Sequence, residues 1–150
     1  MSSIDDVEII NYVKTYFDFL INTGFVIHPV EHISPMDGWR LLLDSKSIQI
    51  QLFSDRGEFF LAINPKHENF WISLSTMVYY LTNEKVLLDD FRGDFYKDRE
   101  KQYQRLAEIL RKYWNEIQEM CNSKLPLQKD EFRNLGKKVS NLKLARFMKH

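Results

Sequence analysis

The sequence contains little cysteine, glycine or proline and has no long apolar run. Its single cysteine, Cys121, has no second thiol in the chain with which to form a disulfide. Five glycines and four prolines in 150 residues are too few for a collagen-like or low-complexity chain. No stretch approaches the roughly 18 consecutive apolar residues of a membrane span, and the acidic start does not look like a signal peptide. We therefore expect a protein of the reducing cytoplasm that has no membrane partner.

The short motifs that most often mark catalytic or nucleotide-binding sites are also missing. The sequence has no phosphate-binding glycine loop, no dinucleotide-binding glycine motif and no serine nucleophile elbow. Cys121 falls on or beside the apolar stripe of an expected helix, where a thiol is normally a small buried group rather than a nucleophile. We expect no enzymatic activity and no cofactor.

Aromatic residues, by contrast, are abundant, at 14% of the chain within a hydrophobic content of 44%. A chain of 150 residues can bury about 70% of its unfolded surface around one core, so a single domain is expected. The aromatic residues could over-supply that core and leave some rings for a surface.

The spacing of apolar residues predicts an α+β fold. Helical spacing is expected from a cap at Ser3 to Ile21, with Gly24 ending the helix in a left-handed conformation. Alternating residues then predict strands at 25–30, 39–43, 48–52 and 59–63, and helical spacing returns at 74–81, 98–121 and 130–148. Short turns between the strands favour antiparallel pairing. We expect an N-terminal helix, a four-stranded antiparallel β-meander and three helices packed on one face.

The formal net charge of zero conceals an uneven distribution. Residues 1–128 carry 14 basic and 19 acidic side chains, whereas residues 129–150 carry seven basic and two acidic ones. We therefore expect a single α+β domain at 1–128 and a basic C-terminal helix at 129–150 that docks on the same domain. The same helix could instead bind another molecule.

Aromatic side chains on the sheet suggest a recognition surface. Phe60 has the opposite parity to Phe59 and Leu61, so it lies on the open face if those two face the helices. Trp39 and Trp71 are the other aromatic residues expected to contact a partner. Alternatively, helix 130–148 or a second copy of the chain covers this face. The sequence leaves the oligomeric state open.

A second candidate surface is the segment LLDDFRGDFYKD, which joins two expected helices. Its aromatic residues could anchor a partner while its acids steer the encounter. The residues assigned to this role are Asp89, Asp90, Phe91, Asp94 and Phe95. The alternative interpretation is a solvated loop without a function.

Two further hypotheses belong to other classes of protein. In the first, the basic helix binds nucleic acid through Lys137, Lys138, Lys143, Arg146 and Lys149, although no nucleic-acid motif is present. In the second, His28 and His32 join the Asp89/Asp90 pair in a metal-dependent hydrolase. Pro29 excludes the helical histidine spacing of such enzymes, so we expect no metal site.

The order of elements is similar to that of a known class of proteins. A helix is followed by Gly24-Phe25, by strands at 39–43 and 48–53, by the turn DRGEFF and by an aromatic-rich short helix. This layout, over roughly residues 4–120, resembles the small bacterial α+β immunity proteins encoded beside polymorphic toxins. The resemblance implies a stoichiometric inhibitor that covers the active site of a toxin or binds a defence-system component. It implies no active-site residue in this chain.

Overall fold

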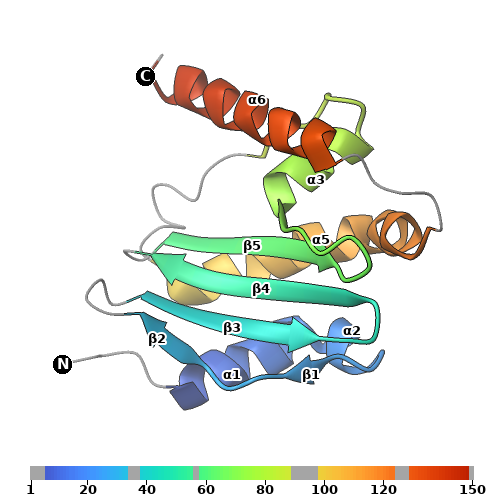
Figure 1. The fold of residues 1–150 in the computed structure, drawn as a ribbon. Coiled ribbons are helices and arrows are strands. Elements are labelled where there is room, and N and C mark those ends of the chain that lie inside the picture. The colour runs from blue at the N-terminus through green and yellow to red at the C-terminus, as the bar shows by residue number, and fades with distance from the viewer. Residues whose placement is uncertain (1–5, 34–37, 56–57, 89–97, 124–128, 149–150) are drawn as a thin grey trace.

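The computed structural model describes residues 6–33, 38–55, 58–88, 98–123 and 129–148. Within them the chain forms five helices and one sheet of six strands (Figure 1). The helices are α1 (Asp6–Tyr16), α2 (Asp18–Ile21), α3 (Leu74–Leu81), α5 (Arg99–Asn122) and α6 (Lys129–Met148). The strands are β1 (Val26–Ile27), β2 (Glu31–Ile33), β3 (Gly38–Asp44), β4 (Ile48–Asp55), β5 (Glu58–Pro65) and β6 (Ile72–Ser73). The α+β class and the antiparallel sheet are confirmed, whereas four helices and four strands were expected.

Strands β3, β4 and β5 form the expected meander at the centre of the sheet. Leu41 pairs with Leu52, and Leu52 pairs in turn with Leu61. Because alternate residues point to the same face of a strand, this register places one row of buried leucines across all three strands. The predicted boundaries are short by one to three residues at the strand ends.

The two edges of the sheet differ from the prediction. The expected first strand at 25–30 contains only β1, and β2 follows it as a strand that was not predicted; the two pair with opposite ends of β3. Pro29 lies between them and has no N–H with which to continue a ladder, which accounts for the break. Strand β6 was not predicted, because a two-residue strand is too short to show alternation.

The N-terminal helix is interrupted where one continuous helix was expected. Phe17 has φ −106° and ψ 28°, outside the α-helical region, and separates α1 from α2. Its ring is fully buried, so the break accompanies its insertion into the core. Gly24 has φ +105° and ends the second helix as predicted. A residue with a Cβ atom would be strained in this conformation, whereas glycine adopts it freely. The expected cap Ser3 lies outside the described residues.

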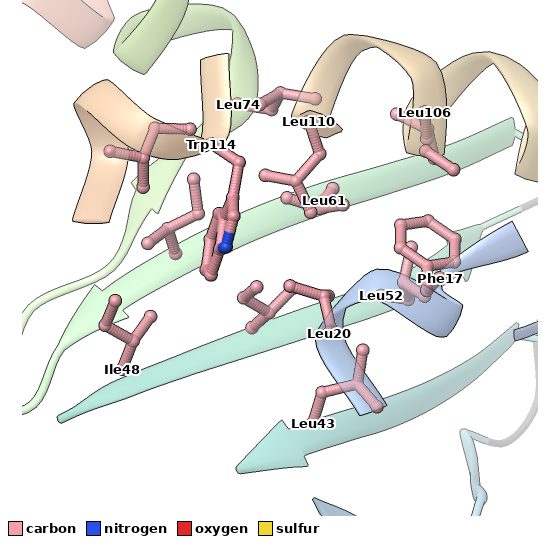
Figure 2. Packing of buried hydrophobic residues seen from close by; sticks show 14 of the residues in the cluster. Phe17, Leu20, Leu43, Ile48, Leu52, Leu61, Leu74, Leu106, Leu110 and Trp114 are labelled. Carbon is pink, nitrogen blue, oxygen red and sulfur yellow. The ribbon is translucent and has the colours of Figure 1, made fainter. Parts of the chain in front are cut away.

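The core lies between the sheet and helices α1, α2 and α5. Figure 2 shows buried side chains from the strands meeting others from these helices, among them Leu20 of α2 and Leu110 of α5. Asp98 is the N-cap of helix α5, and its carboxylate accepts a hydrogen bond from the Lys101 N–H at 3.2 Å. In Figure 1, α1 and α5 lie behind the sheet, so this face of the meander is covered.

Helices α3 and α6 form a second group beside β5 (Figure 1). Ser73 caps α3, accepting a hydrogen bond from the Thr76 N–H at 3.1 Å. Helix α6 packs against α3 through the buried side chains of Phe132 and Val139. Asp130 and Glu131 lie in the first turn of α6. No helix in the described part of the chain is long and apolar enough to cross a membrane.

Candidate functional site

The second face of the meander is crossed by no described helix (Figure 1). This face carries a pair of stacked aromatic rings. Phe53 of β4 and Phe60 of β5 are directly opposite one another, with ring centroids 5.1 Å apart and planes inclined by 23°. Phe60 is 39% exposed, whereas its neighbours Phe59 and Leu61 are buried on the helix side. The position of Phe60 on the open face is therefore as predicted.

A groove of about 1040 Å³ begins at this aromatic pair and extends to α6. Its lining comes from β4, β5, β6, α3, α5, α6, the segment before β6 and the segment after α3. The side chains on the strand side are Phe53, Glu58, Phe60, Leu61, Phe70, Trp71 and Ile72, and those on α6 are Lys129, Phe132, Arg133, Lys137, Lys143 and Leu144. The groove therefore has an apolar floor and a basic wall.

Trp71 lies at the rim of the groove because β6 alternates at its start. The side chain of Ile72 is buried beneath the sheet edge, and that of Trp71, one residue earlier, is 43% exposed. Successive residues of an extended chain point to opposite sides, so burial of Ile72 leaves Trp71 outside. The structure therefore brings Phe60 and Trp71, two of the residues predicted to bind a partner, to one groove.

The orientation of α6 is set by its contacts with α3. The centroid of the Phe132 ring lies 4.7 Å from the centroid of the Tyr80 ring and 6.1 Å from that of the Phe70 ring. On the side of α6 that faces away from the groove, Lys138 forms an ion pair with Glu84, and this hydrogen bond raises the pKa of Lys138. These contacts turn the side of α6 that carries Lys129, Arg133 and Lys137 toward the groove.

The basic residues predicted to bind nucleic acid do not share one surface. Lys137 and Lys143 line the groove, and Lys143 also donates a hydrogen bond to Ser75 Oγ at 2.6 Å. Lys138 is held by Glu84, and Arg146 donates to the Leu87 carbonyl oxygen at 3.3 Å. Lys149 lies outside the described residues. The described members therefore divide between the groove and the side of α6 that faces the end of α3.

Trp39 was expected on a binding surface and is instead in the core. Its side chain is 1% exposed. The ring packs edge-on against that of Phe59, with centroids 5.3 Å apart, and stacks with that of Tyr103, with centroids 6.1 Å apart. The reason is parity, because Trp39 precedes Leu41 and Leu43 by two and four residues and therefore shares their buried face. Trp39 cannot contact a partner in this fold, and its assignment as a binding residue is wrong.

Five of the predicted binding residues belong to the acidic segment between α3 and α5. Asp89, Asp90, Phe91, Asp94 and Phe95 all lie outside the described residues.

The two histidines considered for a metal-dependent enzyme contact different carboxylates. His28 Nε2 lies 3.5 Å from Asp44 Oδ2, and His32 Nε2 lies 2.5 Å from Asp6 Oδ1. Lys66 also contacts Asp44, and this hydrogen bond is the main cause that lowers the pKa of the Asp44 carboxyl. Among the described residues, no group of three or more histidine, cysteine, aspartate or glutamate side chains could hold a metal ion.

Cys121 is buried at the end of α5. It is 1% exposed, and burial raises the pKa of its thiol to about 12. The thiol is therefore protonated at neutral pH, and a protonated thiol is a poor nucleophile.

The sequence reasoning missed three residues of the groove. Phe53 has the opposite parity to Ile50 and Leu52, which are buried, so alternation along β4 could have placed it on the open face. Lys129 and Arg133 precede Lys137 by eight and four residues, a spacing that puts the three on one side of a helix.

Comparison with known proteins places the chain in no established family. No family model matches it, and no curated protein and no solved structure is significantly similar to it.

Proposed function

We propose that this protein is a non-catalytic binding module that holds a partner protein in the groove and on the adjoining open face of the sheet. The observation that carries the proposal is that Phe53, Phe60 and Trp71 all line one groove of about 1040 Å³, with Phe53 and Phe60 stacked on each other. Aromatic residues are enriched at the centres of protein interfaces, where they act as anchors.

The exposed fractions give the scale of the expected contribution. Fully burying a large apolar side chain contributes roughly 1.5–3 kcal/mol, and Phe60 and Trp71 are 39% and 43% exposed. Covering what remains exposed would contribute on the order of 1 kcal/mol for each residue. Two such anchors in a surrounding interface affect binding by about tenfold or more.

The specific role that we propose is that of an immunity-type inhibitor of a bacterial toxin or of a defence-system component. The support for this finer role is the resemblance in the layout of residues 4–120 to small immunity proteins. A groove formed by docked helices is a pre-formed surface, and a pre-formed surface loses little conformational freedom on binding. Such a surface suits an inhibitor that works by covering a partner's active site.

The decisive experiment compares two double variants in binding and protection. Phe60→Ser with Trp71→Ser removes both anchors, and Val7→Ser with Val26→Ser removes two exposed apolar side chains at other positions. The partner is first sought among the products of flanking genes, and the complex is then reconstituted from two purified proteins. We expect the anchor variant to bind at least about tenfold more weakly and to lose protection of cells that express the toxin, while the control behaves as wild type.

Two results would contradict the proposal. In the first, the anchor variant and the control bind the partner equally well, which would place the interface elsewhere. In the second, no flanking gene encodes a toxin and no protein forms a stoichiometric complex with the purified chain.

The second candidate function is nucleic-acid binding through α6. The observation in its favour is the proximity of Lys137 and Lys143 to exposed aromatic rings, because single-stranded nucleic acids bind to cationic grooves with stacking platforms. Retention on immobilised single-stranded DNA, measured on a salt gradient, tests it. Loss of retention in a Lys137→Gln, Lys143→Gln variant would support this function, and no retention of the wild type at low salt would exclude it.

A further inference from the structure

The wall of the groove contributed by α6 carries a regular row of cations. Lys129, Arg133 and Lys137 recur at four-residue intervals, all three are exposed, and all three line the groove. Four residues of helix rise about 6 Å, so the row extends for about 12 Å along the groove. Arg133 Nη1 lies 3.7 Å from Asp130 Oδ1. Both side chains are largely exposed, so this ion pair is weak and leaves Arg133 able to contact a ligand.

The opposite wall offers little negative charge to balance this row. Glu58 is the one acidic residue among the described lining residues, against four that are lysine or arginine. The charge of the chain as a whole is zero, so the excess of cations is a local property of the groove. A ligand that enters it meets an apolar floor and a positive wall, and electrostatic complementarity favours a negative one.

The edge of the sheet in the groove is closed to an added strand near Phe59. Strand β6 pairs with β5 only at Ala62 and Ile63, so within the described part of the chain no strand pairs with the start of β5 on that side. The backbone N–H of Phe59 is nevertheless occupied, because it donates to Gln102 Oε1 at 3.0 Å from the buried side chain of Gln102. Recognition through side chains is therefore favoured over recognition by strand addition.

We propose that the groove binds an acidic amphipathic segment of the partner protein, with apolar side chains on Phe60 and Trp71 and carboxylates facing Lys129, Arg133 and Lys137. The inference rests on the proposed function and specifies the chemistry of the partner. An amphipathic helix in an apolar groove presents anchors on one side at three- and four-residue spacing. Carboxylates at four-residue spacing on its flank would match the spacing of the cations on α6.

The test uses two designed peptides and one oligonucleotide as probes. Both peptides are fluorescein-labelled amphipathic helices of about five turns with leucine on one face, and they differ only in having glutamate or glutamine on the flank. The third probe is a labelled single-stranded DNA of similar length. Binding to the full-length protein is measured by fluorescence anisotropy.

Two protein variants of identical charge change separate the groove from the rest of the surface. The groove variant is Lys129→Gln, Arg133→Gln, Lys137→Gln, and the control variant replaces the exposed residues Lys14, Lys46 and Lys101 with glutamine. We expect the glutamate peptide to bind wild type at least about tenfold more tightly than the glutamine peptide. We expect the groove variant to lose at least about fivefold in affinity for the glutamate peptide and the control to lose less than about twofold.

Several results would overturn the inference. Equal binding of the two peptides, equal losses in the two variants, or no binding of the glutamate peptide would each do so. Tighter binding of the oligonucleotide with the same dependence on the groove cations would assign the groove to nucleic acid. If the natural partner depends on Phe60 and Trp71 but not on the three cations, the proposed function stands and this inference fails.

Discussion

Removal of the Phe132 side chain should detach α6 from the domain while leaving the sheet intact. Phe132 is 5% exposed and Val139 is 3% exposed, and they are the fully buried apolar side chains among the described residues of α6. Burial of two large side chains contributes on the order of 3–6 kcal/mol to docking of this helix. The exposed pair of Lys138 with Glu84 adds little to that figure, and the partly buried hydrogen bond from Lys143 to Ser75 of α3 adds more.

The expected effect of Phe132→Ala follows from this estimate. Truncation of a buried phenylalanine costs about 3–5 kcal/mol, which is comparable with the whole docking contribution. A loss of about 3 kcal/mol corresponds to a change of roughly 100-fold in the opening equilibrium of α6. Because the basic wall of the groove belongs to this helix, Phe132→Ala should also abolish the preference for the glutamate peptide.

Amide hydrogen exchange resolved by segment is the appropriate assay, because it reports local opening separately from global unfolding. Leu144→Ala serves as the control, since Leu144 is on the same helix but is 56% exposed. We expect protection of the α6 amides to fall by about 100-fold in Phe132→Ala, with β3, β4 and β5 unchanged and with no change in the control. Equal protection of α6 in the two variants would refute the argument, as would a uniform loss of protection across the chain.

Three further predictions concern the core and its edges. Gln102→Leu removes the acceptor of a buried strand N–H and should lower the free energy of unfolding, measured in urea, by about 1–3 kcal/mol. The control Gln104→Leu, at an exposed position of the same helix, should change that free energy little, and equal effects of the two variants would contradict this role for Gln102. Asp44 has a pKa lowered below its ordinary value of 3.8 by Lys66, so its stabilising contribution is present above that value and is lost as the pH falls through the folded-state pKa. Unfolding free energies measured from about pH 5 to about pH 2 should therefore decline less steeply in Asp44→Asn, and an unchanged slope would exclude the pair with Lys66 as a contributor. Cys121 should react with a thiol reagent only as fast as the protein opens, and a reaction as fast as that of a free thiol would contradict its burial.

The sequence was sufficient to predict the elements whose burial follows a regular period. Burial alternates over six or seven residues in strands β3, β4 and β5, and α5 has an apolar stripe along 24 residues, so each pattern is long enough to indicate its element. The break at Phe17 had no such signal, because its ring continues the apolar stripe of α1 and the interruption arises from its tertiary environment. Strand β6 contributes two residues, and only the position of β5 makes them a strand.

The binding surface was predictable in part for similar reasons. Alternation along β5 correctly placed Phe60 on the open face, and applied equally to β3 it would have placed Trp39 in the core. The groove could not be predicted, because it exists only where α6 docks beside β6, and that position depends on the fit of Phe132 and Val139 to α3. Amphipathic spacing shows that a helix has a buried side but not which neighbour buries it.

The central claim, that the groove is where a partner protein binds, is tested most directly by hydrogen exchange of the chain with and without that partner. The account predicts slower exchange in β5, β6 and α6, which border the groove, and no change in β1 and β2 at the far edge of the sheet. Slower exchange confined to β1 and β2, or no change along the groove in a saturated complex, would contradict it.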